Sequence, residues 1–184
     1  VVSAVNVSQR LVDVVDRLGA DLALTPIGST NIITRIRDIH DGGDRVKIAG
    51  EGNSGILFPG YRLARDGAYT AARFLELVAD RPASDLAAPF DDYHYVRRNV
   101  EYSSTTQKEA AIDAVARVAE TADADLDTTD GYRLSYDDGW VLARESGTDP
   151  LVRVYAEARH ADRAEALASR LSDAITGAVA EASH

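Results

Sequence analysis

The sequence contains no cysteine and no methionine among its 184 residues. Without cysteine the chain forms no disulfide and offers no thiolate ligand to a metal, as is typical of cytoplasmic proteins. It has no apolar run of about 18 residues, the length that a membrane-spanning helix requires. Its first residues also lack the charged and apolar regions of a secretory signal peptide. We therefore expect a cytoplasmic protein with no membrane partner.

Lysine is nearly absent, because Lys47 and Lys108 stand against 18 arginines, and 21 aspartates outnumber 9 glutamates. The formal net charge of −10 argues against nucleic acid as a partner, because nucleic-acid binding requires a basic field. An acidic, lysine-poor surface is typical of halophilic proteins, and a GC-rich genome also favours alanine, arginine and aspartate. Under the halophilic interpretation, self-repulsion destabilises the compact state at low ionic strength.

The absence of methionine bears on the origin of the chain, which begins with Val1. A translated product starts with methionine, so this beginning indicates a piece of a longer protein. At 45% hydrophobic residues the chain can bury a core, which makes disorder the weaker interpretation.

Strands and helices alternate through the first half of the sequence. Short apolar runs bounded by turn residues predict strands, and apolar residues at helical spacing predict helices. The expected strands cover residues 1–7, 21–25, 46–49 and 56–58, and the expected helices cover residues 9–18, 32–39 and 68–79. This alternation predicts a three-layer α/β/α domain over residues 1–85, with a parallel, helix-covered sheet and ligands bound beyond the carboxyl ends of its strands.

The last helix of this half carries apolar residues at helical spacing, and Ala72, Leu75 and Val78 are expected to face the core. Three aromatic residues near it, Tyr61, Tyr69 and Phe74, are interpreted as packing residues.

Two prolines and weak periodicity in residues 80–92 predict a linker and a domain boundary. After it, strand-like runs at 93–102, 132–136, 140–143 and 151–158 accompany helical runs at 105–122 and 162–181. Thr105 or Thr106 is expected to cap the first of these helices. The order predicts a smaller α+β domain over residues 90–184, an antiparallel sheet with helices on one face.

A glycine-rich loop, Gly50-Glu51-Gly52-Asn53-Ser54-Gly55, follows the third expected strand of the first half. Its glycines allow a ligand to approach the backbone, and Glu51 provides a carboxylate that accepts hydrogen bonds. Asn53 provides both a donor and an acceptor, which suits neighbouring hydroxyls of a sugar. A solvated turn that satisfies its own polar groups is an equally strong interpretation of these residues.

A second loop lies between the strands at 140–143 and 151–158. It carries the hydroxyls of Ser146 and Thr148 on either side of Gly147, with Arg144 before it and Arg153 after it. Arginine matches phosphate geometry with two parallel hydrogen bonds, and turn amides form anion-binding nests. The residues therefore predict a phosphate site with several free backbone N–H groups, and an ordinary hairpin loop is the alternative.

No other constellation points to chemistry. The four histidines are scattered without the spacing of a metal site, and we interpret them as surface or half-buried residues. The aspartate pairs at 91–92 and 137–138 are explained by a linker and a hairpin turn. No nucleophile–base motif and no glycine-rich nucleotide loop is present.

Taken together, the loop at residues 50–55, the Asp66-Gly67 turn and the loop at residues 144–150 resemble the α-D-phosphohexomutase superfamily, which contains phosphomannomutase, phosphoglucomutase and phosphoglucosamine mutase. The strand 151–158 (LVRVYAEA) also resembles the one that follows the phosphate loop of that family. The resemblance covers nearly the whole chain and matches the third and fourth domains of a four-domain enzyme. It implies an isomerase that moves a phosphoryl group between O1 and O6 of a hexose, through a phosphoserine, a bound Mg²⁺ ion and a hexose 1,6-bisphosphate intermediate.

The resemblance also implies roles for the residues of the two loops, which face a hexose phosphate. Glu51 and Asn53 would hold sugar hydroxyls. The phosphate that is not reacting would be held by Arg144, Ser146, Gly147, Thr148 and Arg153.

The family's phosphoserine loop and aspartate-rich magnesium loop have no counterpart in this sequence. We therefore expect no catalytic or metal-binding residue in the chain, and we expect it to be inactive without the amino-terminal domains of the same protein. A stand-alone, non-catalytic phosphosugar-binding module and a purely structural pair of domains are the alternatives. An exposed face left by missing domains would make an oligomer possible.

Three departures from the family pattern affect the site. Glu145 stands where many members have proline, so it must point away from the loop or weaken phosphate binding. Gly28-Ser29-Thr30 matches a turn whose second position often carries histidine or aspartate, which leaves a ligand contact there unsupported. The loop at Glu51 lacks the Ser-Gly-His ending of phosphoglucosamine mutases, which leans the substrate away from glucosamine phosphate.

Overall fold

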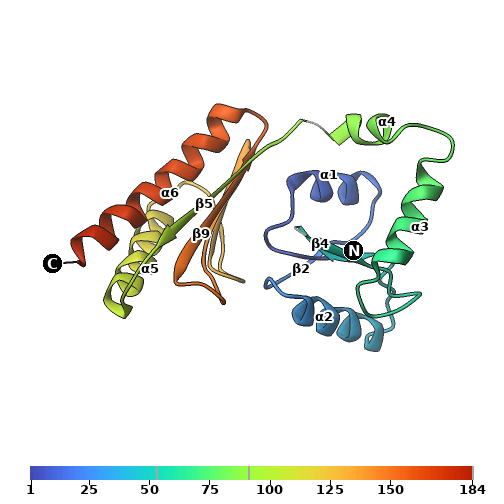
Figure 1. Ribbon diagram of the computed structural model, residues 1–184, viewed down its shortest axis with the longest axis horizontal. Coiled ribbons are helices and arrows are strands. Elements are labelled where there is room, and N and C mark those ends of the chain that lie inside the picture. Colours follow the sequence, from blue (N-terminus) through green and yellow to red (C-terminus); the bar gives the residue numbers. More distant parts are fainter. Residues whose placement is uncertain (53, 91, 184) are drawn as a thin grey trace. The chain divides into compact units, whose positions relative to one another are not determined.

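The computed structural model describes residues 1–52, 54–90 and 92–183, and it divides into two compact units, Val1–Asp92 and Tyr93–His184. Each unit contains its own sheet (Figure 1). Each unit also has its own hydrophobic core.

The first unit is built on a four-stranded sheet in the order β2-β1-β3-β4. Its strands are β1 (Val2–Ala4), β2 (Ala23–Thr25), β3 (Ala49–Glu51) and β4 (Ser54–Leu57). β1 pairs in parallel with both β2 and β3, which confirms the predicted parallel core of the sheet. β4 pairs antiparallel with β3, because the very short connection between them permits only a hairpin. The sheet is therefore mixed, with one antiparallel edge.

Two helices cover opposite faces of this sheet, as Figure 1 shows. They are α1 (Gln9–Arg17) and α2 (Ser29–Asp41). Ser8 caps α1 by accepting a hydrogen bond from the Arg10 N–H, as its position before an apolar helical run predicts. Ile32 and Ile36 on one side of α2 are fully buried against the sheet.

The third helix, α3 (Gly67–Leu77), has no buried residue. The expectation that Ala72 and Leu75 face the core is wrong, since both are exposed, Leu75 by 65%. Phe74, expected to pack, is 50% exposed. The helix lies beside the edge strand β4, and an apolar groove of about 760 Å³ separates Phe74 and Leu77 from Ile56 of that strand. Helical spacing predicts an apolar face on α3. This face stays exposed because the narrow edge of a four-stranded sheet does not supply enough surface to cover it.

The connection after α3 is structured where a linker is expected. It contains the short helices α4 (Ala83–Ala87) and η1 (Ala88–Phe90), neither of which has a buried residue. Tyr61 and Tyr69, which precede this region, stack with their ring centroids 4.2 Å apart.

The second unit is a five-stranded antiparallel sheet in the order β5-β9-β8-β7-β6, packed against two helices. This confirms the predicted α+β architecture, with both helices on one face (Figure 1). Its elements are β5 (His94–Glu101), α5 (Thr105–Glu120), β6 (Asp125–Asp127), β7 (Tyr132–Tyr136), β8 (Gly139–Glu145), β9 (Leu151–Ala158) and α6 (Ala161–Glu181). The sequence does not reveal β6, because a three-residue strand with aspartate at each end shows no apolar alternation.

The core of the second unit lies between the sheet and the two helices. Val115 of α5 and Leu171 of α6 pack with Leu134 and Val154 of the sheet, and all four are at most 1% exposed. The cap of α5 is Ser104, whose hydroxyl accepts from the Gln107 N–H, and the expected caps one and two residues later lie inside the helix. No helix of the described residues is long and apolar enough to cross a membrane.

Candidate functional site

The loop of residues 146–150 joins β8 to β9, and the register of these strands places its two flanking arginines side by side. Arg144 and Arg153 are direct cross-strand partners. Both alternate with Ala143 and Val154, which face the helices, so the two arginines lie on the opposite face of the sheet. Antiparallel pairing thus brings together two guanidinium groups that the sequence separates by eight residues.

Ser146 organises the backbone of this loop. Its Oγ atom accepts hydrogen bonds from the N–H groups of Thr148 and Asp149, at 3.4 and 3.3 Å. Its own N–H donates to the Leu151 carbonyl at 2.9 Å, and the residue is only 5% exposed. The expectation of several free backbone N–H groups is therefore wrong for these three amides, because the loop folds onto its own serine.

The remaining donors of the loop converge on one oxygen of the Asp149 carboxylate. Oδ2 accepts from Thr148 Oγ1 at 2.7 Å, from Arg153 Nη2 at 2.8 Å and from Ser146 Oγ at 3.3 Å. The hydrogen bond from Thr148, followed by that from Arg153, holds the pKa of the Asp149 carboxyl below its usual value of 3.8. Two hydroxyls and a guanidinium thus already hold a negatively charged oxygen in this loop.

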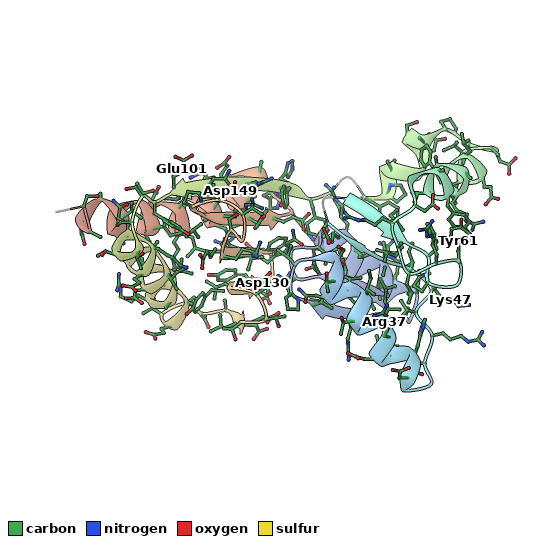
Figure 2. All side chains as sticks on the ribbon, turned by 60° about the horizontal axis from the view of Figure 1, so that its bottom comes forward. Arg37, Lys47, Tyr61, Glu101, Asp130 and Asp149 are labelled. Atoms are coloured by element: carbon green, nitrogen blue, oxygen red, sulfur yellow. The ribbon has the colours of Figure 1, made fainter. Side chains whose placement is uncertain are left out.

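Arg144 is held by a second carboxylate. Its Nε donates to Asp130 Oδ1 at 3.2 Å, and the two side chains are 14% and 19% exposed. Asp130 belongs to the turn before β7, and it is labelled with Asp149 in Figure 2. Because Nε is engaged, Asp130 fixes the direction of the guanidinium plane.

Glu145 points away from this group of donors. Neighbouring residues of a strand face opposite sides of the sheet, and Glu145 lies on the side of α5. Its carboxylate accepts from Lys108 Nζ at 2.6 Å and from the Tyr102 hydroxyl at 3.3 Å. The hydrogen bond to Glu145 raises the pKa of the Lys108 amine, so the glutamate charge is compensated on that face.

In the first unit, Glu51 is the last residue of β3 and is half-buried. Asn53, its expected partner in sugar recognition, lies outside the described residues. The neighbouring glycines are explained by packing within the chain. A Cβ at Gly50 would lie 3.0 Å from the Gly55 carbonyl, and one at Gly52 would lie 3.1 Å from the Asn6 carbonyl. Close backbone packing thus accounts for two glycines that the sequence suggested would admit a ligand.

Asn6 is a candidate that the sequence analysis missed. It follows β1 and is 5% exposed, and its Oδ1 has no hydrogen-bond partner among the described residues. Its backbone touches Gly52, next to Glu51, so the ends of β1 and β3 meet here. Buried side-chain oxygens are normally paired, which makes this one a candidate acceptor for a ligand. The sequence predicts a strand over residues 1–7, which places Asn6 inside the strand, whereas β1 ends at Ala4 and leaves Asn6 beyond its carboxyl end.

The turn at Gly28-Ser29-Thr30 begins α2, and no side chain caps that helix. Gly28 has a φ angle of 129°, a conformation that only glycine adopts readily, so the backbone explains this glycine.

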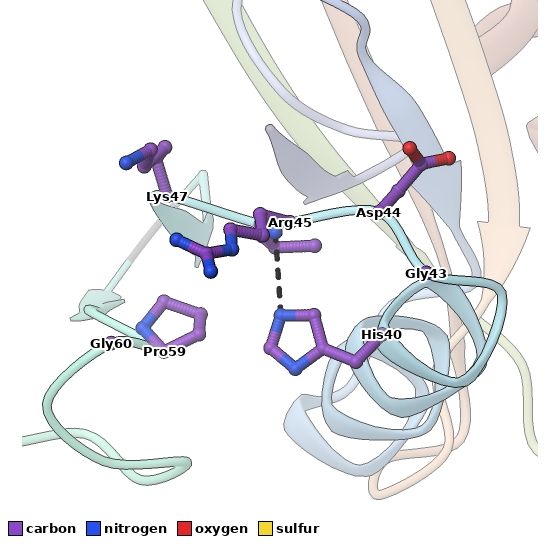
Figure 3. Close-up of a pocket in the computed structure, with 8 residues that line it drawn as sticks. His40, Gly43, Asp44, Arg45, Lys47, Pro59 and Gly60 are labelled. Carbon is purple, nitrogen blue, oxygen red and sulfur yellow. Dashed lines mark hydrogen bonds between the residues drawn. The ribbon is translucent and has the colours of Figure 1, made fainter.

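A pocket of about 430 Å³ lies near the start of β3, at the other end of this strand from Glu51 (Figure 3). It is lined by Arg45, Lys47 and Pro59, together with His40, whose Nε2 accepts a hydrogen bond from the Val46 N–H at 3.3 Å. None of the residues predicted to bind a ligand lines it. Within the part of the chain that the structure describes, no group of three or more histidine, aspartate or glutamate residues could hold a metal ion.

Comparison with known proteins identifies the two units as a pair of phosphohexomutase domains. Residues 1–93 match the family model "Phosphoglucomutase/phosphomannomutase, alpha/beta/alpha domain III", and residues 97–174 match the model of the C-terminal domain. The chain belongs to the phosphoglucomutase/phosphomannomutase family, and the resemblance to the α-D-phosphohexomutase superfamily is confirmed.

Individual relatives agree with this membership. A phosphoglucomutase/phosphomannomutase of Thermococcus kodakarensis is 35% identical over 89% of the chain and 35% of its own length. A phosphoglucosamine/phosphogalactosamine mutase of Sulfurisphaera tokodaii is 30% identical over 96% of the chain and 38% of its own length. The solved structure of a phosphoglucomutase/phosphomannomutase family protein from Burkholderia thailandensis shares the fold, with a TM-score of 0.78 at 24% identity over 96% of this chain and 37% of that one. The chain thus spans little more than a third of the length of these relatives.

Proposed function

We propose that this chain is the substrate-binding, carboxyl-terminal part of a phosphohexomutase of the phosphomannomutase/phosphoglucomutase type. The complete protein moves a phosphoryl group between O1 and O6 of a hexose phosphate, through a phosphoserine and a hexose 1,6-bisphosphate intermediate. The observation that carries this proposal is the convergence of Ser146, Thr148 and Arg153 on one anionic oxygen. Donors that already hold a carboxylate oxygen are suited to hold a phosphate oxygen.

The loop between β8 and β9 binds the phosphate that is not reacting. Thr148 and Ser146 donate from their hydroxyls, and Arg153 supplies a charged, forked donor. Gly147 lies between the hydroxyl residues, where no heavy atom comes within 4 Å of a Cβ built on it, so the loop is open on that side. Arg144, oriented by Asp130, supplies a second positive charge on the same face of the sheet.

The end of the first sheet recognises the sugar. Glu51 accepts hydrogen bonds from sugar hydroxyls, and the unpaired Oδ1 of Asn6 adds a second acceptor beside it. Asn53 completes this group in the proposal, as a residue that can both donate and accept. Glu51 and Asn6 lie at the carboxyl ends of parallel strands, which is where ligands generally bind in such sheets.

The phosphoserine and the Mg²⁺ ion belong, in this proposal, to amino-terminal domains of the complete protein. In this proposal the chain contributes no catalytic step. When bound, Mg²⁺ would neutralise charge on the phosphoryl group in transfer. The chain itself holds and orients the hexose phosphate, and we expect it to be inactive alone.

The experiment is a mutase assay of the complete protein with glucose and mannose phosphates, comparing Arg153→Ala with the control Arg163→Ala. Arg163 also pairs with an aspartate on the surface of the second unit, at 2.9 Å from Asp138. Removal of a phosphate-binding arginine should lower kcat/KM by about 100-fold or more, whereas the control should stay near wild type. Equal activities of the two variants would refute the role of the loop.

A stand-alone, non-catalytic phosphosugar-binding module is the second candidate, because the donors of the phosphate loop all come from one unit. It requires that the 184-residue chain alone bind hexose phosphates, and that the reading frame upstream of Val1 encode neither a phosphorylated serine loop nor an aspartate-rich metal loop. Discovery of both loops upstream would eliminate this candidate.

A further inference from the structure

The position of Asp149 poses a problem for any anion that binds this loop. The three donors suited to a phosphate oxygen all point at Oδ2 of Asp149. A phosphate that takes the same donors must either displace this carboxylate or lie beside it. In the second case the phosphate and the carboxylate would repel each other. Near a protein surface, the repulsion between two unit charges about 4 Å apart costs about 4 kcal/mol.

We propose that Asp149 is a specificity-determining residue that competes with the bound anion, so that the loop accepts a phosphate dianion and rejects monoanions. This inference rests on the proposed function of the loop. A phosphate group offers three acceptor oxygens and about two negative charges, so it can satisfy Thr148, Ser146 and Arg153 at once when the carboxylate leaves. Chloride offers one charge and no fixed geometry, and it gains too little from the same donors to displace Asp149.

The carboxylate is free to move without unfolding the loop. The side chain of Asp149 is 52% exposed, so a rotation about χ1 can carry it into solvent. Its backbone stays in place, because its N–H is bound by Ser146 Oγ and its carbonyl accepts from the Leu151 N–H at 2.8 Å. Ser146 and Thr148 therefore keep their positions while the carboxylate leaves Arg153.

The competing interpretation is that Asp149 only stabilises the conformation of the loop. The two interpretations predict opposite changes in phosphate affinity when the charge of Asp149 is removed. If Asp149 competes, its neutral isostere asparagine should bind phosphate more tightly. If it braces Thr148 and Arg153 for the ligand, the same change should weaken phosphate binding.

The test uses the 184-residue chain and inorganic phosphate, with backbone amide shifts of Gly147 and Thr148 as the readout. We expect Asp149→Asn to bind phosphate about tenfold more tightly than wild type, because phosphate no longer has to displace a carboxylate from its charge-assisted hydrogen bonds. We also expect chloride to compete with phosphate more effectively in the variant. Asp138→Asn is the matched control. Asp138 also lies in a turn of the second unit and pairs with an arginine, Arg163, so the variant loses the same charge. It should change neither the phosphate affinity nor the competition by chloride.

The possible results distinguish the competitor role of Asp149 from the phosphate-binding role of the loop. Phosphate affinity in Asp149→Asn that is equal to or below wild type, with shifts still confined to the loop, would overturn the competitor role and leave the phosphate loop standing. Absence of loop shifts in both proteins up to high phosphate concentration would overturn the competitor role and the assignment of the loop as a self-contained phosphate site, whereas the mutase assay of the complete protein tests the proposed function separately. Asp149→Ser, which removes the charge with a smaller side chain, should behave as Asp149→Asn does, and thermal unfolding of each variant excludes misfolding as the cause.

Discussion

At the scale of single residues, Asp149 and Glu145 show how one loop separates two carboxylates. Glu145 is the last residue of β8 and faces α5, where Lys108 compensates its charge. Asp149 lies in the turn, where the hydroxyls of Ser146 and Thr148 and the guanidinium of Arg153 hold it. The difference comes from strand alternation, because Glu145 follows Arg144 and must face the other side of the sheet.

Gly147 should be replaceable without loss of stability. Its φ angle is not positive, and no heavy atom lies within 4 Å of a Cβ built on it. We expect Gly147→Ala to change the free energy of unfolding by less than about 0.5 kcal/mol. Because a methyl group would enter the open side of the loop, phosphate affinity should fall several-fold. Thermal unfolding and phosphate titration measure the two effects, and a large loss of stability would show that the backbone requires glycine.

Asp149 should titrate below the ordinary aspartate value of 3.8, because Thr148 and Arg153 donate to its charged form. A carboxyl whose folded-state pKa is lowered contributes stability above its unfolded-state pKa. That contribution is lost as the pH falls through the lowered pKa. We expect the hydrogen bonds of the loop to persist at neutral pH and to be lost as the pH falls through the lowered pKa of Asp149. Carboxyl NMR titration checks this, and Thr148→Val should raise the pKa of Asp149; an unchanged value would contradict the assigned cause.

At the scale of elements, α5 and α3 show that the apolar face of a helix is buried only where a neighbouring sheet offers enough surface to cover it. Val115 of α5 is 1% exposed because five strands offer a broad face to the helices of the second unit. Leu75 and Leu77 of α3 are 65% and 60% exposed, because that helix lies beside the short edge strand β4. Helical spacing is similar in both cases, and the neighbouring sheet makes the difference.

Gly177 in helix α6 can be replaced by a residue with a side chain without a loss of stability. Gly177 lies inside the helix, is exposed, and has no atom within 4 Å of a Cβ built on it. Gly177→Ala should stabilise the chain by about 0.5 to 1 kcal/mol, because alanine has the higher helix propensity. Chemical denaturation of the two proteins measures this.

The control for this prediction is Gly19→Ala. Gly19 also has free space around it, but its φ angle is 60° at the end of α1. Alanine in this left-handed conformation costs about 1 kcal/mol, so the control should be destabilised. Stabilisation of both variants would show that backbone conformation does not govern the result.

At the scale of the whole molecule, two units with separate cores carry a net charge of −10. In the described residues each unit has its own sheet, and the predicted binding residues are divided between them. The relatives are much longer than this chain, so we propose that the hexose phosphate is held by several domains of the complete protein.

Salt should stabilise this acidic chain. Chloride salts screen repulsion among its carboxylates, over a Debye length that falls from about 30 Å at 0.01 M to about 3 Å at 1 M. We expect the Tm to rise steadily from about 0.01 M to 1 M sodium chloride, and potassium chloride to act equally. Stabilisation by sulfate alone would instead indicate preferential exclusion of the salt from the protein surface. A Tm that falls with chloride would contradict the role of self-repulsion.

Local spacing in the sequence was sufficient for most elements. Ser8 before an apolar run located the start of α1, and the aspartate pair 137–138 located the turn between β7 and β8. The resemblance of two loops to a known family supplied the candidate binding residues, which remain a prediction. The cap and the turn were predicted correctly because such features depend on residues that are close together in the chain.

The tertiary structure alone decided which side chains share a site. It paired Arg144 with Arg153, brought Asn6 to Gly52, and directed the donors of the loop to Asp149. It also left the apolar side of α3 exposed, although the sequence predicted a buried face. The physical reason is that register, cross-strand pairing and burial depend on segments far apart in the chain, about which local patterns carry no information.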